Sequence, residues 1–247
     1  MSGMIQAIND FLRFIPAEIR SIIWYTFDVV LLVIIACILA SWYLFTKVKS
    51  LKKAFLCGLL AFIAFVVVII FALLIEKMTG NVVLISGVTY FTFYLLCATI
   101  IISKYLRYDI LEIADIAALA YLPARAINVI GCTVEGCCQG VPAEWGLYSA
   151  ILRTNVVPVQ LYESVAIFVI WSVLNLLYKH HRFSCNGKCA AYCLIFFGGL
   201  NVFTDIFTYI QPKLIYMLSV EGIFAFLTMV IGLIMLYILD NTRNKSA

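Results

Sequence analysis

Seven long apolar runs, separated by short polar connections, dominate the chain. A helix of about 20 apolar residues crosses a bilayer core about 30 Å thick, and each run meets or approaches that length. The runs cover residues 22–45, 55–75, 82–103, 111–130, 161–178, 190–210 and 214–239. They predict an all-α integral membrane protein with seven transmembrane helices. The run at 111–130 is the least regular because it carries acidic residues, a proline and an arginine.

The composition excludes a soluble globular protein. Hydrophobic residues make up 65% of the 247 positions and charged residues only 12%, against about 45–50% and about 25% in soluble domains. A soluble fold could not cover so much apolar surface with polar groups. The net charge of +4 is modest, so we expect membrane lipid rather than nucleic acid as the partner.

The first 21 residues differ from the rest because apolar side chains such as Phe11 and Leu12 lie close to charged ones, among them Arg13 and Arg20. They predict an amphipathic helix at the membrane surface that ends near Pro16, with a frayed terminus as the alternative. We therefore divide the chain into an amphipathic segment (1–21), a seven-helix membrane domain (22–240) and a short tail (241–247).

Lys and Arg are distributed unequally between the two ends of the predicted helices. They are more numerous in the first, third and fifth connections and in the C-terminal tail than on the opposite side. Since basic residues stay in the cytoplasm, we expect an outside N-terminus, a cytoplasmic C-terminus and an outward-facing connection at 131–160.

Arg125 is the most unusual polar residue within the runs, and Asn128 follows it three positions later. A guanidinium can hold a phosphate through two parallel hydrogen bonds. The alternative is a long side chain that extends to the outer head groups. Glu112 and Asp115, at the start of the same helix, are expected to complement its dipole.

Asn201 and Asp205 are four residues apart, so they share one face of the sixth predicted helix. The preceding pair Gly198-Gly199 would let another backbone approach closely. The two polar residues favour either an interhelical hydrogen bond or a polar partner for Asp205, such as an arginine or a substrate group.

The segment 131–140 reads GCTVEGCCQG and predicts a turn-rich stretch rather than more helix. Its three cysteines are consistent with one disulfide from Cys132 to Cys137 or Cys138. No histidine lies nearby, and the cysteines at 185, 189 and 193 have helical spacing, so we expect neither a metal site nor a cofactor.

Four motifs occur in order along the second half of the chain. They are GCTVEGCCQG, PVQLYES at 158–164, FFGGLNVFTD at 196–205 and LSVEG at 218–222. Together they resemble the prolipoprotein diacylglyceryl transferase family over residues 111–239. PVQLYE soon after GCC is the most specific part of the resemblance.

The resemblance implies a transferase of the bacterial plasma membrane that acts in lipoprotein biosynthesis. It would move diacylglycerol from phosphatidylglycerol to the cysteine thiol of a lipoprotein-precursor peptide. Arg125, Glu163 and Asp205 are the catalytic candidates. The candidates for substrate binding are Asn128, Gly136, Cys137, Gly140, Gln160, Tyr162 and Asn201.

The chain departs from the family pattern at several positions. Val129 stands where the glycine-rich turn has an arginine, with Arg125 one helical turn earlier. Val157 replaces the histidine before the PVQLYE segment, and Asn201 replaces an arginine. These departures favour an alternative hypothesis, a catalytically degenerate protein that keeps the fold and binds lipid.

Overall fold

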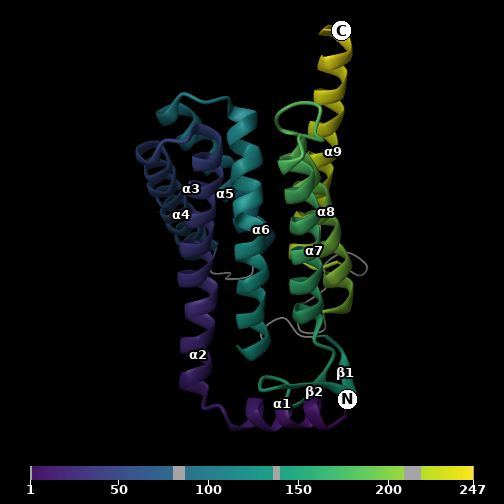
Figure 1. Cartoon of the computed structure of the whole chain (residues 1–247). Coiled ribbons are helices and arrows are strands. Elements are labelled where there is room, and N and C mark those ends of the chain that lie inside the picture. Colours follow the sequence, from purple (N-terminus) through teal and green to yellow (C-terminus); the bar gives the residue numbers. More distant parts are fainter. Residues whose placement is uncertain (1, 80–86, 136–139, 209–217, 247) are drawn as a thin grey trace.

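The computed structural model describes residues 2–79, 87–135, 140–208 and 218–246. Long helices run up and down a bundle, and a short helix and a β-hairpin lie across its lower end in Figure 1. The elements are α1 (Ser2–Phe14), α2 (Ala17–Tyr25), η1 (Thr26–Leu31), α3 (Leu32–Val48), α4 (Leu51–Thr79), α5 (Gly87–Leu106), α6 (Ile110–Glu135), β1 (Pro142–Ser149), β2 (Thr154–Val156), α7 (Val159–Lys179), α8 (Lys188–Phe207) and α9 (Val220–Ser246).

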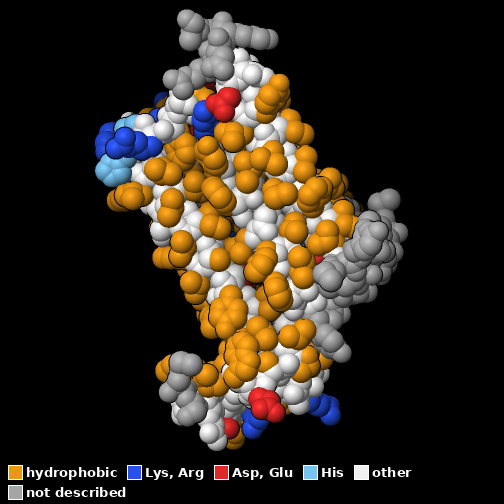
Figure 2. All heavy atoms as spheres, turned by 90° about the vertical axis from the view of Figure 1, so that its right-hand side faces the viewer, with side chains coloured by type: hydrophobic (Ala, Val, Ile, Leu, Met, Phe, Trp, Pro, Cys, Tyr) orange, Lys and Arg blue, Asp and Glu red, His pale blue; other side chains and the backbone are white. Residues whose placement is uncertain are grey.

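The protein is an all-helical, multi-pass membrane protein. Five described helices (α4, α6, α7, α8 and α9) are long and apolar enough to cross a bilayer, and the apolar stretches of α3 and α5 are shorter. Helix α3 is the last part of a longer helix, because α2, the π-helical turn η1 and α3 follow one another without a break. Apolar side chains cover the middle of the face shown in Figure 2, as a lipid-facing surface requires.

Several predicted boundaries were wrong. The largest error concerns Gly131 to Glu135, which we expected to form a turn but which extend α6. Gly131 and Cys132 are buried, so packing in the bundle stabilises a helical stretch that glycine disfavours. The last helix begins at Val220 rather than 214, the sixth ends at Phe207 rather than 210, and residues 209–217 lie outside the described part.

Helix α6 is the centre of the bundle. It packs against α3, α5, α7 and α8, and 83% of its apolar stretch is buried inside the protein. Figure 1 shows it between the group formed by α3, α4 and α5 and the group formed by α7, α8 and α9. Polar residues on α6 are therefore held inside the protein and away from lipid.

Helices α8 and α9 pack so closely that glycine is required between them. A Cβ added at Gly198 would lie 2.7 Å from both Ala225 O and Met229 N, and one at Gly232 would lie 2.8 Å from Ala191 O. The predicted close backbone approach at Gly198 is confirmed. This contact fixes the position of α9 beside the polar end of α8.

The β-hairpin of β1 and β2 was not predicted from the sequence. Its strands pair antiparallel, with Tyr148 opposite Asn155. Helix α1, which forms as predicted and ends before Pro16, is attached to it by Asn9. The Asn9 side chain donates to Gly146 O at 3.2 Å and accepts from the Tyr148 backbone N–H at 2.8 Å.

Candidate active site

A buried ion pair joins α6 to α7 near the hairpin end of the bundle. Arg125 Nη2 lies 3.6 Å from Glu163 Oε1, and the two side chains are 14% and 11% exposed. Arg125 Nη1 also donates to Asn128 Oδ1, one turn further along α6. A charge inside a membrane protein is costly unless it is paired, and these contacts offset that cost.

The beginning of α7 is held firmly against α6. Ser164 Oγ donates to the Ala126 carbonyl at 2.6 Å, and Ser164 and Glu163 are both buried. Gln160 is 2% exposed and lies one turn before Glu163, so the two side chains share one face of α7. The predicted residues Arg125, Asn128 and Glu163 are thus brought together, and Gln160 is buried on the same face of α7 as Glu163.

Tyr162 is not part of this buried group. Its side chain is 54% exposed, because its position on α7 is rotated about 100° from that of Glu163. If Tyr162 binds substrate, it does so on the exposed face of α7.

Asp205 joins the end of α8 to the start of α9. Its two carboxylate oxygens accept hydrogen bonds from the Ser219 hydroxyl at 2.6 Å and the Ser219 backbone N–H at 2.8 Å. Gly222 packs directly against this carboxylate, where a Cβ would overlap Asp205 Oδ2. Asp205, predicted as catalytic, therefore has a clear structural function in placing α9.

Glu221 lies in the first turn of α9. It is close enough to Glu163 for the two carboxylates to interact electrostatically. Asp205 is hydrogen-bonded to Ser219, and Glu221 follows Ser219 by two residues in the chain. Asp205 thereby influences the position of a second acid beside the Arg125–Glu163 pair.

Gly140 connects the hairpin to the same region. Its backbone N–H donates to Val157 O at 3.3 Å, and it pairs with Thr208 in an isolated bridge. Val157 directly precedes the PVQLYE segment and Thr208 directly follows α8. The glycine-rich segment, the start of α7 and the end of α8 therefore meet at one place.

Asn201 makes a local contact, in which its side-chain amide donates to Phe197 O at 2.9 Å on its own helix. Gly136 and Cys137 lie outside the described residues, as does Cys138, so the predicted disulfide from Cys132 stays a prediction. Cys132 itself is buried near the end of α6.

The model for the family described as prolipoprotein diacylglyceryl transferase matches residues 14–238, most of the chain. The chain belongs to this family. The resemblance predicted for residues 111–239 is confirmed, and the match extends it through the first three apolar runs. No individual curated protein matches the chain. Membership in the diacylglyceryl transferase family implies transfer of a diacylglyceryl group, with phosphatidylglycerol and a lipoprotein precursor as substrates.

Three residues of this diacylglyceryl transferase fold were not predicted as parts of the site. Ser164 follows Glu163 within the PVQLYES motif, whereas Ser219 and Glu221 belong to LSVEG, in which no site residue was predicted. The motifs could have indicated these residues, because each motif contains an uncommon polar residue at the end of an apolar run. Their contacts depend on how the helices are rotated, which the motifs do not specify.

Proposed function

We propose that the chain is a phosphatidylglycerol–prolipoprotein diacylglyceryl transferase. Arg125 would bind the phosphate of a phosphatidylglycerol-like lipid, assisted by Asn128 and Gln160. Glu163 would accept the proton of the incoming thiol. No cofactor enters this proposal.

The observation that carries the proposal is the buried Arg125–Glu163 pair. Its 3.6 Å separation is longer than the roughly 2.7–2.9 Å of a tight charge-assisted hydrogen bond. Arg125 can therefore exchange part of its contact with Glu163 for a lipid phosphate. This exchange would release the carboxylate to act as a base at the moment when substrate arrives.

The proposed reaction is a displacement at the glyceryl carbon that bears the phosphate. The cysteine sulfur forms a bond to that carbon while the carbon–oxygen bond to phosphate breaks. The electron pair of the broken bond leaves with glycerol phosphate, whose negative charge Arg125 stabilises. The thiol proton passes to Glu163.

Transfer of lipid to a synthetic lipobox peptide tests this proposal directly. The full chain would be purified and mixed with phosphatidylglycerol, and lipid-modified peptide would be measured by mass spectrometry. Arg125→Ala should lower the rate by about 10²–10³-fold, as loss of other electrostatic stabilisers does. Arg182→Ala, an exposed arginine in the loop after α7, serves as the matched control.

Absence of any transfer by the unsubstituted chain, in the peptide assay and in a strain depleted of its own transferase, would reject the proposal. Equal activity of Arg125→Ala and the unsubstituted chain would reject the role of Arg125.

A second candidate function is lipid binding without turnover, in a protein that keeps the family's fold. Two observations favour it. Val129 is 1% exposed where the family pattern has an arginine, and Asn201 bonds to its own helix. This candidate predicts that phosphatidylglycerol binds with no peptide product, and that Arg125→Ala weakens binding only.

We also propose seven spans, with the continuous helix of α2, η1 and α3 as the first and α5 as the third. The hairpin and the amphipathic segment (residues 1–21), which contains α1, would lie at the outer surface, and residues 241–247 in the cytoplasm. The location would be a bacterial plasma membrane. The basic side chains of the connections after α3, α5 and α7 support this orientation.

A further inference from the structure

A cavity of about 570 Å³ opens at the basic end of the bundle, opposite the candidate active site. It lies between α3, α7 and the loop that leads into α8, and Asp115 of α6 reaches it. The basic side chains in its lining are Lys47, Lys179 and His181. We call this cavity the basic-end pocket.

The acidic groups at the basic-end pocket already have partners within the protein. Lys47 Nζ lies 2.6 Å from Glu112 Oε1. The Asp115 carboxylate accepts backbone hydrogen bonds from Gly187 at 2.8 Å and Ala190 at 2.7 Å. These amides lie at the start of α8, whose dipole compensates a negative charge.

Lys179, in the last turn of α7, is in a different situation. It makes no ion pair with any side chain in the described ranges, and it is exposed at the mouth of the pocket. His181 is two residues away and can donate a hydrogen bond from its ring. The positive charge of Lys179 is therefore available to an anion, and a phosphate group would suit it.

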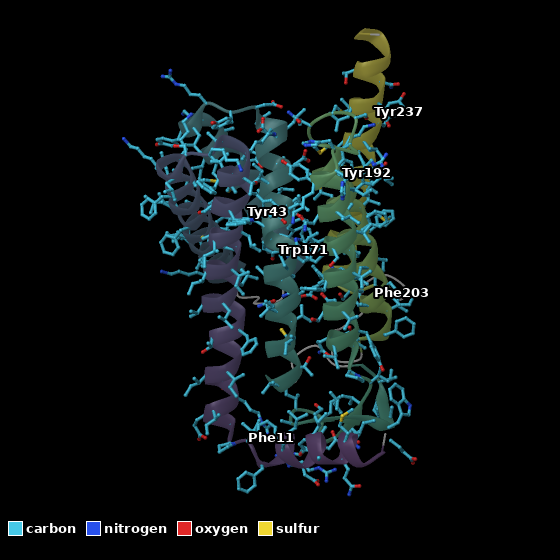
Figure 3. All side chains as sticks on the ribbon, viewed as in Figure 1. Phe11, Tyr43, Trp171, Tyr192, Phe203 and Tyr237 are labelled. Carbon is cyan, nitrogen blue, oxygen red and sulfur yellow. The ribbon has the colours of Figure 1, made fainter. Side chains whose placement is uncertain are left out.

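One wall of the basic-end pocket is aromatic. Tyr43 on α3 donates to Asn175 of α7 at 2.9 Å, and its ring meets that of Tyr178 edge to face at 6.4 Å. In Figure 3, Tyr43 of α3 lies at a height in the bundle close to that of Trp171 of α7, which is not among the residues that line the pocket. Trp42 lines the pocket and is 57% exposed, as is typical of an aromatic residue at a membrane interface.

We propose that the basic-end pocket binds the phosphate head group of an anionic phospholipid, with an acyl chain lying along α3 and α7 beside Trp42. Basic pockets between transmembrane helices bind such head groups. The aromatic wall favours a lipid over a free anion, because inorganic phosphate would gain nothing from it. This inference concerns the end of the bundle away from Arg125 and does not depend on catalysis.

Photolabelling tests the proposal. The purified full chain would be placed in phosphatidylcholine vesicles containing a small fraction of phosphatidylglycerol with a photoactivatable acyl chain. Labelled positions would be mapped by mass spectrometry. We expect labelling of the Trp42–Lys47 segment in addition to any labelling near Arg125, so the two sites are measured separately.

Lys179→Gln should reduce labelling of the Trp42–Lys47 segment about fivefold, the effect of about 1 kcal/mol per basic residue at an anionic surface. Lys179→Arg should restore it. Lys104→Gln is the matched control, since Lys104 also lies in the last turn of its helix and is exposed, but does not line the pocket. It should leave the labelling unchanged.

Three results would overturn the proposal. The first is equal loss of labelling in Lys104→Gln and Lys179→Gln, which would indicate general surface charge. The second is equal labelling by a photoactivatable phosphatidylcholine. The third is loss of labelling when inorganic phosphate is added at constant ionic strength, which would make the pocket a site for free phosphate.

Discussion

Glu163 has one cationic and one acidic neighbour. The cation is Arg125 at 3.6 Å, and the acid is Glu221 in the first turn of α9. A carboxylate between a cation and a second acid can change partner when a substrate arrives, which is what a base in a displacement reaction requires. The same closeness means that Glu163 would contribute both to folding and to the proposed catalysis. The two contributions need separate measurements.

Glu163→Gln tests the proposed catalytic contribution, because it keeps the size of the side chain and removes its charge. We expect the rate of peptide lipidation to fall by about 10²–10⁴-fold, as with the loss of other general bases. The substrate concentration for half-maximal rate should change far less. The unfolding temperature in detergent must be measured in parallel, since a buried pair with one partner removed destabilises a protein by about 3–5 kcal/mol.

Ser172→Ala, a polar change at an exposed position of the same helix, is the control and should keep both the rate and the unfolding temperature. A Glu163→Gln protein that stays folded and fully active would show that another group accepts the proton.

The packing of α8 against α9 depends more on Gly198 than on the neighbouring Gly199. A Cβ at Gly198 would meet the backbone of α9 at 2.7 Å, whereas one at Gly199 would meet only Met229 Sδ at 3.6 Å, an ordinary contact. Chemistry and helix propensity are the same at the two positions, so any difference in stability reports on packing.

Gly198→Ala should lower the unfolding temperature in detergent, because overpacking of this kind costs about 1–3 kcal/mol. Gly199→Ala should leave the temperature unchanged or raise it, since alanine favours helix over glycine by about 1 kcal/mol. Equal unfolding temperatures for the two variants would contradict the close contact between α8 and α9.

Over the whole molecule, charge and polarity separate to the two ends of an apolar bundle. The two histidines of the chain lie at the upper end in Figure 2, beside basic side chains, and α1 and the hairpin lie at the lower end in Figure 1. The candidate active site is near the hairpin end and the basic-end pocket is near the other. Each site would therefore meet a different leaflet.

This arrangement is tested by labelling intact cells with a membrane-impermeant maleimide. Glu144→Cys, exposed in the hairpin, should be labelled, whereas Lys52→Cys, exposed at the start of α4, should react only after the cells are permeabilised. The unsubstituted chain is labelled in parallel, because it has nine cysteines of its own. The reverse pattern would invert the proposed orientation.

The sequence alone determined the helices and the family. Backbone groups in lipid must be paired within a helix, so an apolar run of sufficient length predicts one, and five of the seven predicted runs correspond to long spans. The motifs around 131–140, 158–164 and 218–222 were recognisable as residue patterns. They predicted the neighbourhood of the candidate active site.

Only the tertiary structure decided which polar side chains meet. Arg125 pairs with Glu163, and Asp205 with Ser219, because packing sets the rotation of each helix, and hydropathy contains no information on rotation. The same reason places Tyr162 outside the buried group although its neighbour is inside. Burial also turned Gly131 and the four residues after it into helix, against their local preference, because packing outweighs a propensity of about 1 kcal/mol.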